Sequence, residues 1–167
     1  MSAPTIFVIG DHRSSTGPAN VTKAYIEGLK KVTDIKYLRS AGKPARFFEL
    51  LFKLPFCSLT FFSGYSRQNL LGMSLSRLLK KPCIYLMHGS VEYENEINKV
   101  PDEYMARCEY RMLEKADLVL AVSESFEKWL KDRYPQFESK ISHLINGVDW
   151  EELIGRRTKL SESLPDT

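Results

Sequence analysis

The sequence has few cysteines and no long apolar run. Cys57, Cys83 and Cys108 are odd in number and widely spaced, which is unlike a disulfide framework and typical of buried, reduced thiols in a cytosolic protein. No run approaches the roughly 18 apolar residues of a membrane-spanning helix. The N-terminus has no basic region of the kind that opens a signal peptide. We therefore expect a cytoplasmic protein with the length of a single domain, which a hydrophobic core is enough to stabilise.

Several ligand-binding motifs are also missing. The chain has neither the G-x-G-x-x-G fingerprint of dinucleotide-binding folds nor the G-x-x-x-x-G-K-[ST] phosphate loop. His12, His88 and His143 stand apart and the cysteines lack ligand spacing, so we expect no metal and no other cofactor. No nucleic-acid recognition motif is present either, and nucleic acid is not an expected partner.

Acidic residues are scarce in the first 90 positions, which hold 4 Asp/Glu against 13 Lys/Arg, whereas residues 91–167 hold 17 against 11. The net charge of +3 thus hides a basic half and an acidic half. A basic half suits phosphate-bearing ligands or an anionic membrane surface. The alternative is that these cations only keep helices solvated.

Short apolar runs alternate with helical patterns along the chain. Strands are expected at 5–9, 35–38, 58–62, 83–87 and 118–122, and in a last run that begins at Ile141 and leaves the sheet at Asn146-Gly147. Strands that alternate with helices pair in parallel, and apolar strands are buried on both faces. The predicted fold is therefore a doubly wound α/β domain over residues 1–150, followed by a polar linker or truncated edge over 151–167.

Helical spacing also predicts which side chains share one face in two of the helices. The stripe expected to pack on the sheet is Val21, Ala24, Tyr25, Gly28, Leu29 and Val32 in the first helix, and a later helix carries Leu71, Leu75, Leu78 and Leu79 on one face. The polar, acidic stretch 90–99 is expected to be a loop.

Residues that follow the strands are the candidates for a site, because ligands bind beyond the carboxyl ends of the strands in such sheets. After the first strand, Arg13 and Thr16 precede Gly17 at a helix N-terminus, where free N–H groups and the helix dipole favour a phosphate. The alternative is that Gly17-Pro18 simply starts the helix.

A second group of candidates follows the fourth and fifth strands. His88 and Gly89 put an imidazole at this edge, where it can orient a substrate hydroxyl or stabilise developing charge. Glu92 follows, either as an acceptor for the hydroxyls of a sugar or polyol or as a solvated side chain. Ser123 is a plausible helix N-cap after the fifth strand.

The segment 43–56 is rich in aromatic residues and carries an excess of cations. That combination suits a helix lying in the surface of an anionic membrane. The alternative is an ordinary core-facing helix whose basic side chains extend along the surface.

Four segments together carry a family resemblance. They are the loop with Gly17, the run Tyr85-Leu-Met-His88-Gly89, the segment 113–125, and the exit Ile145-Asn-Gly-Val-Asp149. In this order they make the chain resemble the N-terminal, acceptor-side domain of a family 4 retaining glycosyltransferase, which is one Rossmann-like half of the two-domain GT-B fold. The resemblance runs from Ile6 to about Asp149.

This resemblance implies transfer of a sugar from a nucleoside-diphosphate donor to a hydroxyl acceptor, a glycan or a lipid-linked molecule, as in polysaccharide biosynthesis. It implies that the Gly17 loop approaches the donor phosphates, that His88 lies near the reacting sugar and that Ser123 lines the cleft. The hinge to a donor-binding domain would be formed by Asn146, Gly147 and Asp149. Without that domain the chain is expected to be inert. The alternative function is a non-enzymatic α/β module that binds an anion or scaffolds a complex.

Overall fold

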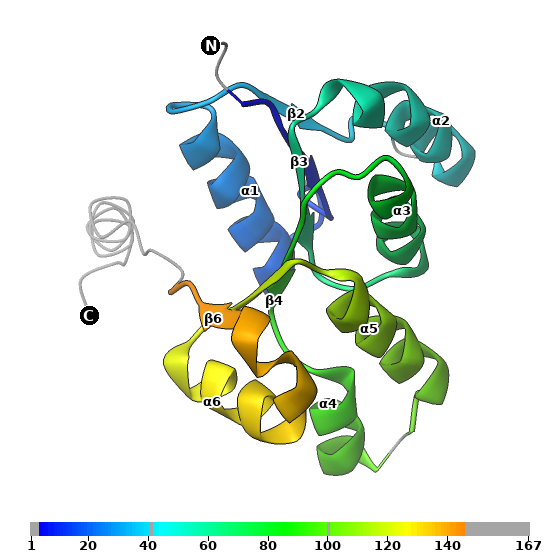
Figure 1. Cartoon of the computed structure of the whole chain (residues 1–167). Coiled ribbons are helices and arrows are strands. Elements are labelled where there is room, and N and C mark those ends of the chain that lie inside the picture. Colours follow the sequence, from blue (N-terminus) through cyan, green and yellow to red (C-terminus); the bar gives the residue numbers. More distant parts are fainter. Residues whose placement is uncertain (1–3, 41, 100, 146–167) are drawn as a thin grey trace, which may run out of the picture.

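The computed structural model describes residues 4–40, 42–99 and 101–145 (Figure 1). Within this part, six strands form one parallel sheet in the order β2-β1-β3-β4-β5-β6. The strands are β1 (Ile6–Ile9), β2 (Ile35–Tyr37), β3 (Leu59–Ser63), β4 (Cys83–Met87), β5 (Leu118–Ala121) and β6 (Ile141–His143). The α/β fold with a parallel sheet is confirmed. The predicted hinge at Asn146, Gly147 and Asp149 lies outside the described residues.

Helices flank this sheet. They are α1 (Gly17–Leu29), α2 (Lys43–Lys53), α3 (Arg67–Leu78), α4 (Val91–Asn98), α5 (Glu103–Lys115) and α6 (Glu124–Arg133), with short 3₁₀ helices η1 (Leu54–Phe56) and η2 (Pro135–Lys140). Figure 1 shows α1 on one side of the sheet and α2, α3 and α5 on the other.

Successive strand residues point to opposite faces and divide the core in two. Phe7, Phe62 and Tyr85 belong to the larger cluster, which also contains buried side chains of α2, α3, α5 and α6. Their strand neighbours Val8 and Phe61 face α1 in the smaller cluster. Cys57, Cys83 and Cys108 are free and buried, as the sequence predicts.

The stretch 90–99 is a helix, so its prediction as a loop was wrong. Ser90 caps α4 by accepting a hydrogen bond from the N–H of Tyr93, at 3.5 Å. Glu109 of α5 accepts two more, from the Ser90 hydroxyl and the Val91 N–H, both at 3.0 Å. Glu109 lies 18 positions after Val91 in the sequence. The acidic composition of the stretch 90–99 therefore gave no sign of this support.

The apolar face predicted for α3 meets the core only through Leu75, which is partly buried against it. Leu78 is 77% exposed, and the buried positions of the helix are Asn69, Gly72, Met73 and Ser76. A Cβ on Gly72 would lie 2.9 Å from a methyl carbon of Leu50 in α2 and 3.1 Å from the ring of Phe62. The helix thus packs through its small residues, which allow a closer approach than leucines would.

The stripe predicted for α1 is correct only in part. Val21, Tyr25 and Leu29 are half-buried against the sheet, but Ala24 and Gly28 are exposed and Val32 is 78% exposed. The fully buried positions are Ala19, Thr22 and Ile26. The face turned to the sheet is therefore rotated toward Thr22, which has a role in the site.

Candidate functional site

A cavity with a volume of about 420 Å³ lies at the carboxyl ends of β1, β3 and β4. The chain leaves β1 toward β2 on one side, whereas β3 lies on the other side of β1. Such a reversal of strand order opens a crevice where ligands bind in doubly wound sheets. Asp11 and Thr16 line the cavity from the β1 loop, Ser63 from β3, and His88 and Gly89 from the end of β4.

A chain of hydrogen bonds holds His88 at this cavity. The Nε2 atom of His88 lies 2.8 Å from Oγ of Ser63, which lies 2.6 Å from Oγ1 of Thr22. The Thr22 hydroxyl in turn lies 2.8 Å from the carbonyl of Pro18. A carbonyl only accepts, so Thr22 donates to Pro18, Ser63 donates to Thr22, and His88 donates to Ser63 through Nε2–H. The Nδ1 atom of His88 is thereby left with its lone pair.

Burial lowers the pKa of His88 from its ordinary value of 6.5. The ring is therefore neutral at physiological pH. A neutral imidazole with a fixed Nε2–H presents Nδ1 as a hydrogen-bond acceptor, which suits a hydroxyl group as its partner.

The tautomer of His88 can be tested directly. At about pH 7.5, long-range ¹H–¹⁵N spectra of the imidazoles are expected to show His88 with Nε2 protonated and Nδ1 bare. Ser63→Ala removes the acceptor of Nε2–H and is expected to give a mixture of the two tautomers. Thr22→Ser keeps the hydroxyl relay and serves as the matched control. An Nδ1–H tautomer in the unmodified chain would contradict the assigned direction of the relay.

The turn after β3 is fixed by contacts that the sequence did not reveal. Gly64 has a φ of +71°, which favours glycine. The amide nitrogen of Asn69 donates to the carbonyls of Ser63 and Gly64, at 3.2 and 2.9 Å. On the other side, a Cβ on Gly10 would lie 2.8 Å from the Cβ of Ser63. These contacts fix the position of Ser63 at the end of β3, and through it the position of the His88 ring.

The loop after β1 shows how α1 begins. Thr16 is the N-cap of α1 and accepts from the N–H of Ala19 at 3.4 Å, and Pro18 occupies the first turn. The interpretation that Gly17-Pro18 starts the helix is confirmed. Thr16 and Pro18, on either side of Gly17, line the cavity, whereas Arg13 lines a smaller one of about 130 Å³ beside it. Their contacts with a phosphate stay a prediction.

Comparison with known proteins gives this site its context. The profile of Glycosyltransferase Family 4 matches residues 36–152. The chain belongs to glycosyltransferase family 4. Among solved structures, it is similar to Anabaena HepE (Alr3699), crystallised in complex with UDP and glucose, with a TM-score of 0.57 and 12% sequence identity. The match covers 95% of this chain and 50% of HepE, so the chain spans about half the length of that protein. No curated protein matches it.

The expected fold, one Rossmann-like half of a GT-B glycosyltransferase, is thereby confirmed for this family 4 domain. At 12% identity the likeness to HepE concerns the fold alone. The described residues contain no group of three or more His, Cys, Asp or Glu that could hold a metal. No described helix is long and apolar enough to cross a membrane.

Glu92 and Ser123, like Arg13 and Gly17, are predicted site residues of this family 4 domain that do not line the His88 cavity. Glu92, in α4, pairs with Arg133 and accepts a hydrogen bond from the Tyr134 hydroxyl. The Arg133 guanidinium is the main cause of the lowered pKa of Glu92. Ser123 is the N-cap of α6, as predicted, and accepts from the N–H of Phe126 at 3.2 Å. Their contacts with substrate stay predictions.

Glu109 is a buried carboxyl that sequence analysis missed. It is 1% exposed, and burial raises its pKa to about 7 from an ordinary value of 4.5, although the Val91 N–H and the Ser90 hydroxyl favour its charged form. The sequence gave no clear sign that Glu109 is buried. It follows Cys108, a buried residue, but the other acidic residues of α5 are exposed. The side chain ties α5 to the start of α4, two residues after Gly89.

The raised pKa of Glu109 predicts how stability depends on pH. The folded chain binds this proton more tightly than the unfolded chain between pH 4.5 and about 7. The free energy of unfolding should therefore fall by about 3 kcal/mol as pH rises through that range. Glu109→Gln is expected to flatten this decline, and Glu27→Gln, at an exposed site of α1, to leave it unchanged. Urea unfolding at about pH 5 and about pH 8 measures both variants.

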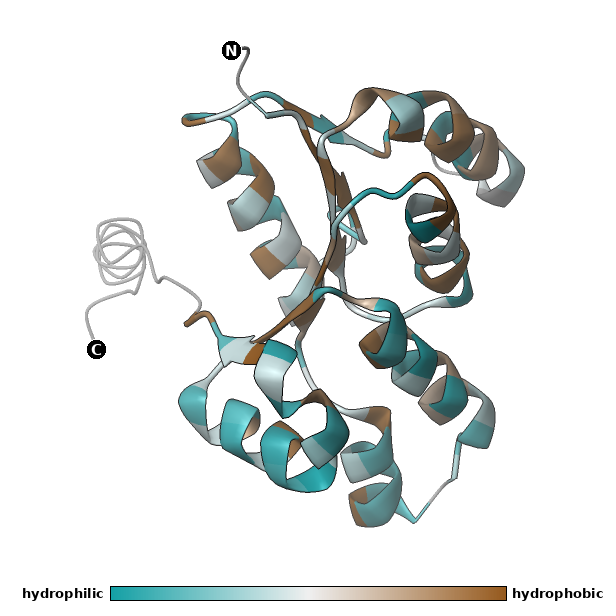
Figure 2. Cartoon of the chain, in the orientation of Figure 1, coloured by the Kyte–Doolittle hydropathy of each residue, from teal (hydrophilic) through white to brown (hydrophobic). Residues whose placement is uncertain are grey.

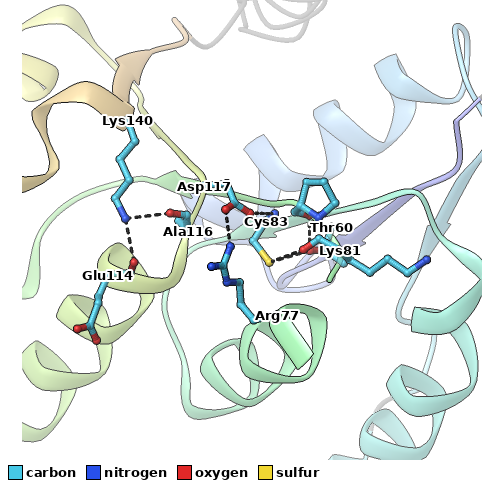
Figure 3. Close-up of polar contacts among 9 residues, drawn as sticks. Thr60, Arg77, Lys81, Cys83, Glu114, Ala116, Asp117 and Lys140 are labelled. Atoms are coloured by element: carbon cyan, nitrogen blue, oxygen red, sulfur yellow. Dashed lines mark hydrogen bonds and ion pairs between the residues drawn. The ribbon is translucent and has the colours of Figure 1, made fainter. Parts of the chain in front are cut away.

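Asp117, within the segment that carried the family resemblance, directly precedes β5 and so lies at the amino ends of the strands, opposite the cavity; its contacts are shown in Figure 3. It accepts the N–H of Cys83 at 2.8 Å and pairs with Arg77 of α3. Nearby, Lys140 donates to the carbonyls of Glu114 and Ala116, both at 2.9 Å, at the C-terminal end of α5. These contacts position β4 and β5, so Asp117 supports the strand that carries His88 without facing the cavity.

Proposed function

We propose that this domain is the acceptor-binding half of a retaining glycosyltransferase, which transfers a sugar from a nucleoside-diphosphate donor to a hydroxyl of a glycan or lipid-linked acceptor. Family membership supports glycosyl transfer in general. The similar HepE was crystallised with UDP and glucose, which supports a nucleotide-sugar donor. The observation that carries the proposal is His88, held with a fixed Nε2–H at the wall of the cavity.

In this proposal, Nδ1 of His88 accepts a hydrogen bond from a sugar or acceptor hydroxyl and orients it for reaction. The N-terminal turns of α1 and α3 both contribute to the cavity wall, through Thr16 and Ser66. Their backbone N–H groups and helix dipoles favour negative charge, which develops on the diphosphate as it leaves. Preorganised dipoles of this kind need little reorganisation during the reaction.

The test is an assay of sugar-nucleotide hydrolysis and transfer with a panel of UDP- and GDP-sugars. The chain is assayed alone and joined to a family 4 donor-binding domain. We expect turnover only in the joined form, because the donor contacts of the other half are then supplied. Equal activity of the chain alone would contradict its role as one half, and inactivity of every combination would favour a binding or scaffolding module.

We further propose that α2 places this domain on the cytoplasmic surface of an anionic membrane. Phe48, Phe52 and Phe56 are 57%, 73% and 71% exposed, whereas Leu50 and Leu54 of the same segment are buried. The helix and its 3₁₀ extension therefore have both a core-facing side and an exposed aromatic side, and Figure 2 shows apolar residues along much of α2. Lys36 lies over the ring of Phe56, with its amine 5.3 Å from the ring centre.

Sedimentation with phosphatidylglycerol vesicles tests this membrane contact. The chain is expected to pellet with them at low salt, less at high salt because surface charges are then screened, and little with neutral vesicles. Phe48→Ser with Phe52→Ser should weaken binding at least tenfold, since each ring would otherwise leave water. Val32→Ser, at another exposed apolar position, should bind like the unmodified chain. No pelleting at low salt would remove the membrane from the proposal.

A further inference from the structure

Arg46, in the first turn of α2, is a cation without an ion pair in the described part of the chain. Its Nε atom is buried and has no hydrogen-bond partner among the described residues. A buried guanidinium nitrogen left unpaired is costly, and nearly all such groups in proteins have a partner. The side chain lines the His88 cavity and also the smaller cavity beside it. Arg46 therefore lies between two cavities, and its Nε–H group has no acceptor among the described residues.

Asp11 also lines both cavities, but donors of its own loop already satisfy its carboxylate. Its carboxylate accepts from the N–H groups of Arg13 and Ser14, at 3.0 and 3.3 Å, and from the Ser14 hydroxyl. The Ser14 hydroxyl is the main cause of its lowered pKa, and the charge of Arg46 is the weakest of the causes. Asp11 therefore shapes the loop and leaves the guanidinium of Arg46 largely uncompensated.

The smaller cavity has the size and lining of an anion site. Its volume of about 130 Å³ is too small for a nucleotide, and both Arg13 and Arg46 line it. Leu38 and Ser40, which follow the edge strand β2, line it as well. It therefore lies toward the β2 edge of the sheet, away from the β5 end. A phosphate or carboxylate there would meet planar, charged donors that suit its oxygens.

We propose that the acceptor is anionic: its reacting hydroxyl lies beside His88, and its phosphate or carboxylate group is bound by Arg46 between the two cavities. This inference rests on the proposed function and narrows its substrate class. It makes Arg46 the residue that selects the acceptor. The donor diphosphate is the other possible source of negative charge, and the experiment separates the two.

The experiment measures binding to the chain itself by NMR titration. The probes are glucose, glucuronate, glucose 6-phosphate and UDP. Glucuronate and glucose 6-phosphate are expected to bind about tenfold more tightly than glucose, because charge-assisted hydrogen bonds are stronger than neutral ones. Arg46→Gln should abolish that difference, and Arg46→Lys should restore part of it. Arg39→Gln, an exposed cation absent from both cavity walls, is the matched control and should preserve it.

Each other outcome overturns either this inference or the proposed function on which it rests. Equal binding of glucose and its anionic derivatives through the millimolar range contradicts an anionic acceptor. A loss on Arg46→Gln confined to UDP assigns the anion to the donor. Binding and transfer fail separately: turnover of neutral acceptors that Arg46→Gln does not change would refute this inference and leave glycosyl transfer standing. Arg46-dependent binding without any turnover would instead refute the transfer proposal.

Discussion

Replacing His88 by alanine is expected to lower sugar transfer by the domain joined to its donor-binding half about a hundredfold or more. The imidazole supplies Nδ1 as the acceptor that orients a hydroxyl, and alanine supplies none. Folding should survive, because the side chain is only half-buried and its hydrogen bond to Ser63 contributes on the order of 1 kcal/mol. Initial rates over a range of acceptor concentrations separate turnover from binding.

Two further variants control this result. Ser63→Ala keeps the imidazole of His88 but removes the hydroxyl that fixes its tautomer. It should therefore give a smaller loss of turnover than His88→Ala. His143→Ala, at β6, removes an imidazole that pairs with Glu127 outside the cavity, and turnover should be unchanged. Full activity of a folded His88→Ala protein would take His88 out of the site.

Gly10→Ala is expected to destabilise the domain by about 2–3 kcal/mol, the cost of forcing extra volume into a packed interior. The added Cβ would lie 2.8 Å from the Cβ and 2.9 Å from the carbonyl oxygen of Ser63. Both obstacles belong to the neighbouring strand, so relief requires β1 and β3 to separate. Urea unfolding of the two proteins gives the difference in free energy.

Gly28→Ala, in α1, is the matched control for Gly10→Ala. A Cβ there meets nothing within 4 Å, and alanine favours helix over glycine by up to about 1 kcal/mol. This variant should therefore be at least as stable as the unmodified chain. Equal effects of the two substitutions would contradict the close approach of Gly10 to β3.

Gly10→Ala should also change the tautomer of His88, because the added methyl group displaces Ser63, the hydrogen-bond partner of His88.

The sheet could be predicted from sequence because its strands are short, apolar and separated by helical patterns. His88 and Thr16 could be placed near the site for a related reason, since every parallel strand ends at the same edge. The helix faces were harder. On α3 the leucines follow helical spacing, yet Gly72 and Ser76 make the close contact, because packing distance and not hydrophobicity alone decides which face turns inward.

The supporting groups of the site could not be predicted, because their partners lie far apart in the chain. Ser63 and Thr22 are 41 positions apart, and Ser63 and His88 are 25 apart. Serine and threonine are common enough that neither one suggests a relay by itself. Arg46 was noticed only as part of a basic, aromatic segment. The position of its buried Nε atom between two cavities depends on how α2 packs, which no local pattern encodes.

The strand order has a consequence for synthesis on the ribosome. β1 is an inner strand flanked by β2 and β3, and every later strand adds beyond β3 in chain order. The sheet can therefore assemble in the direction of translation, each new strand covering the open edge left by the one before it. At roughly 5–20 residues per second, successive strands emerge seconds apart. During those intervals the exposed edge of the nascent sheet is the surface that most needs protection from pairing with other chains.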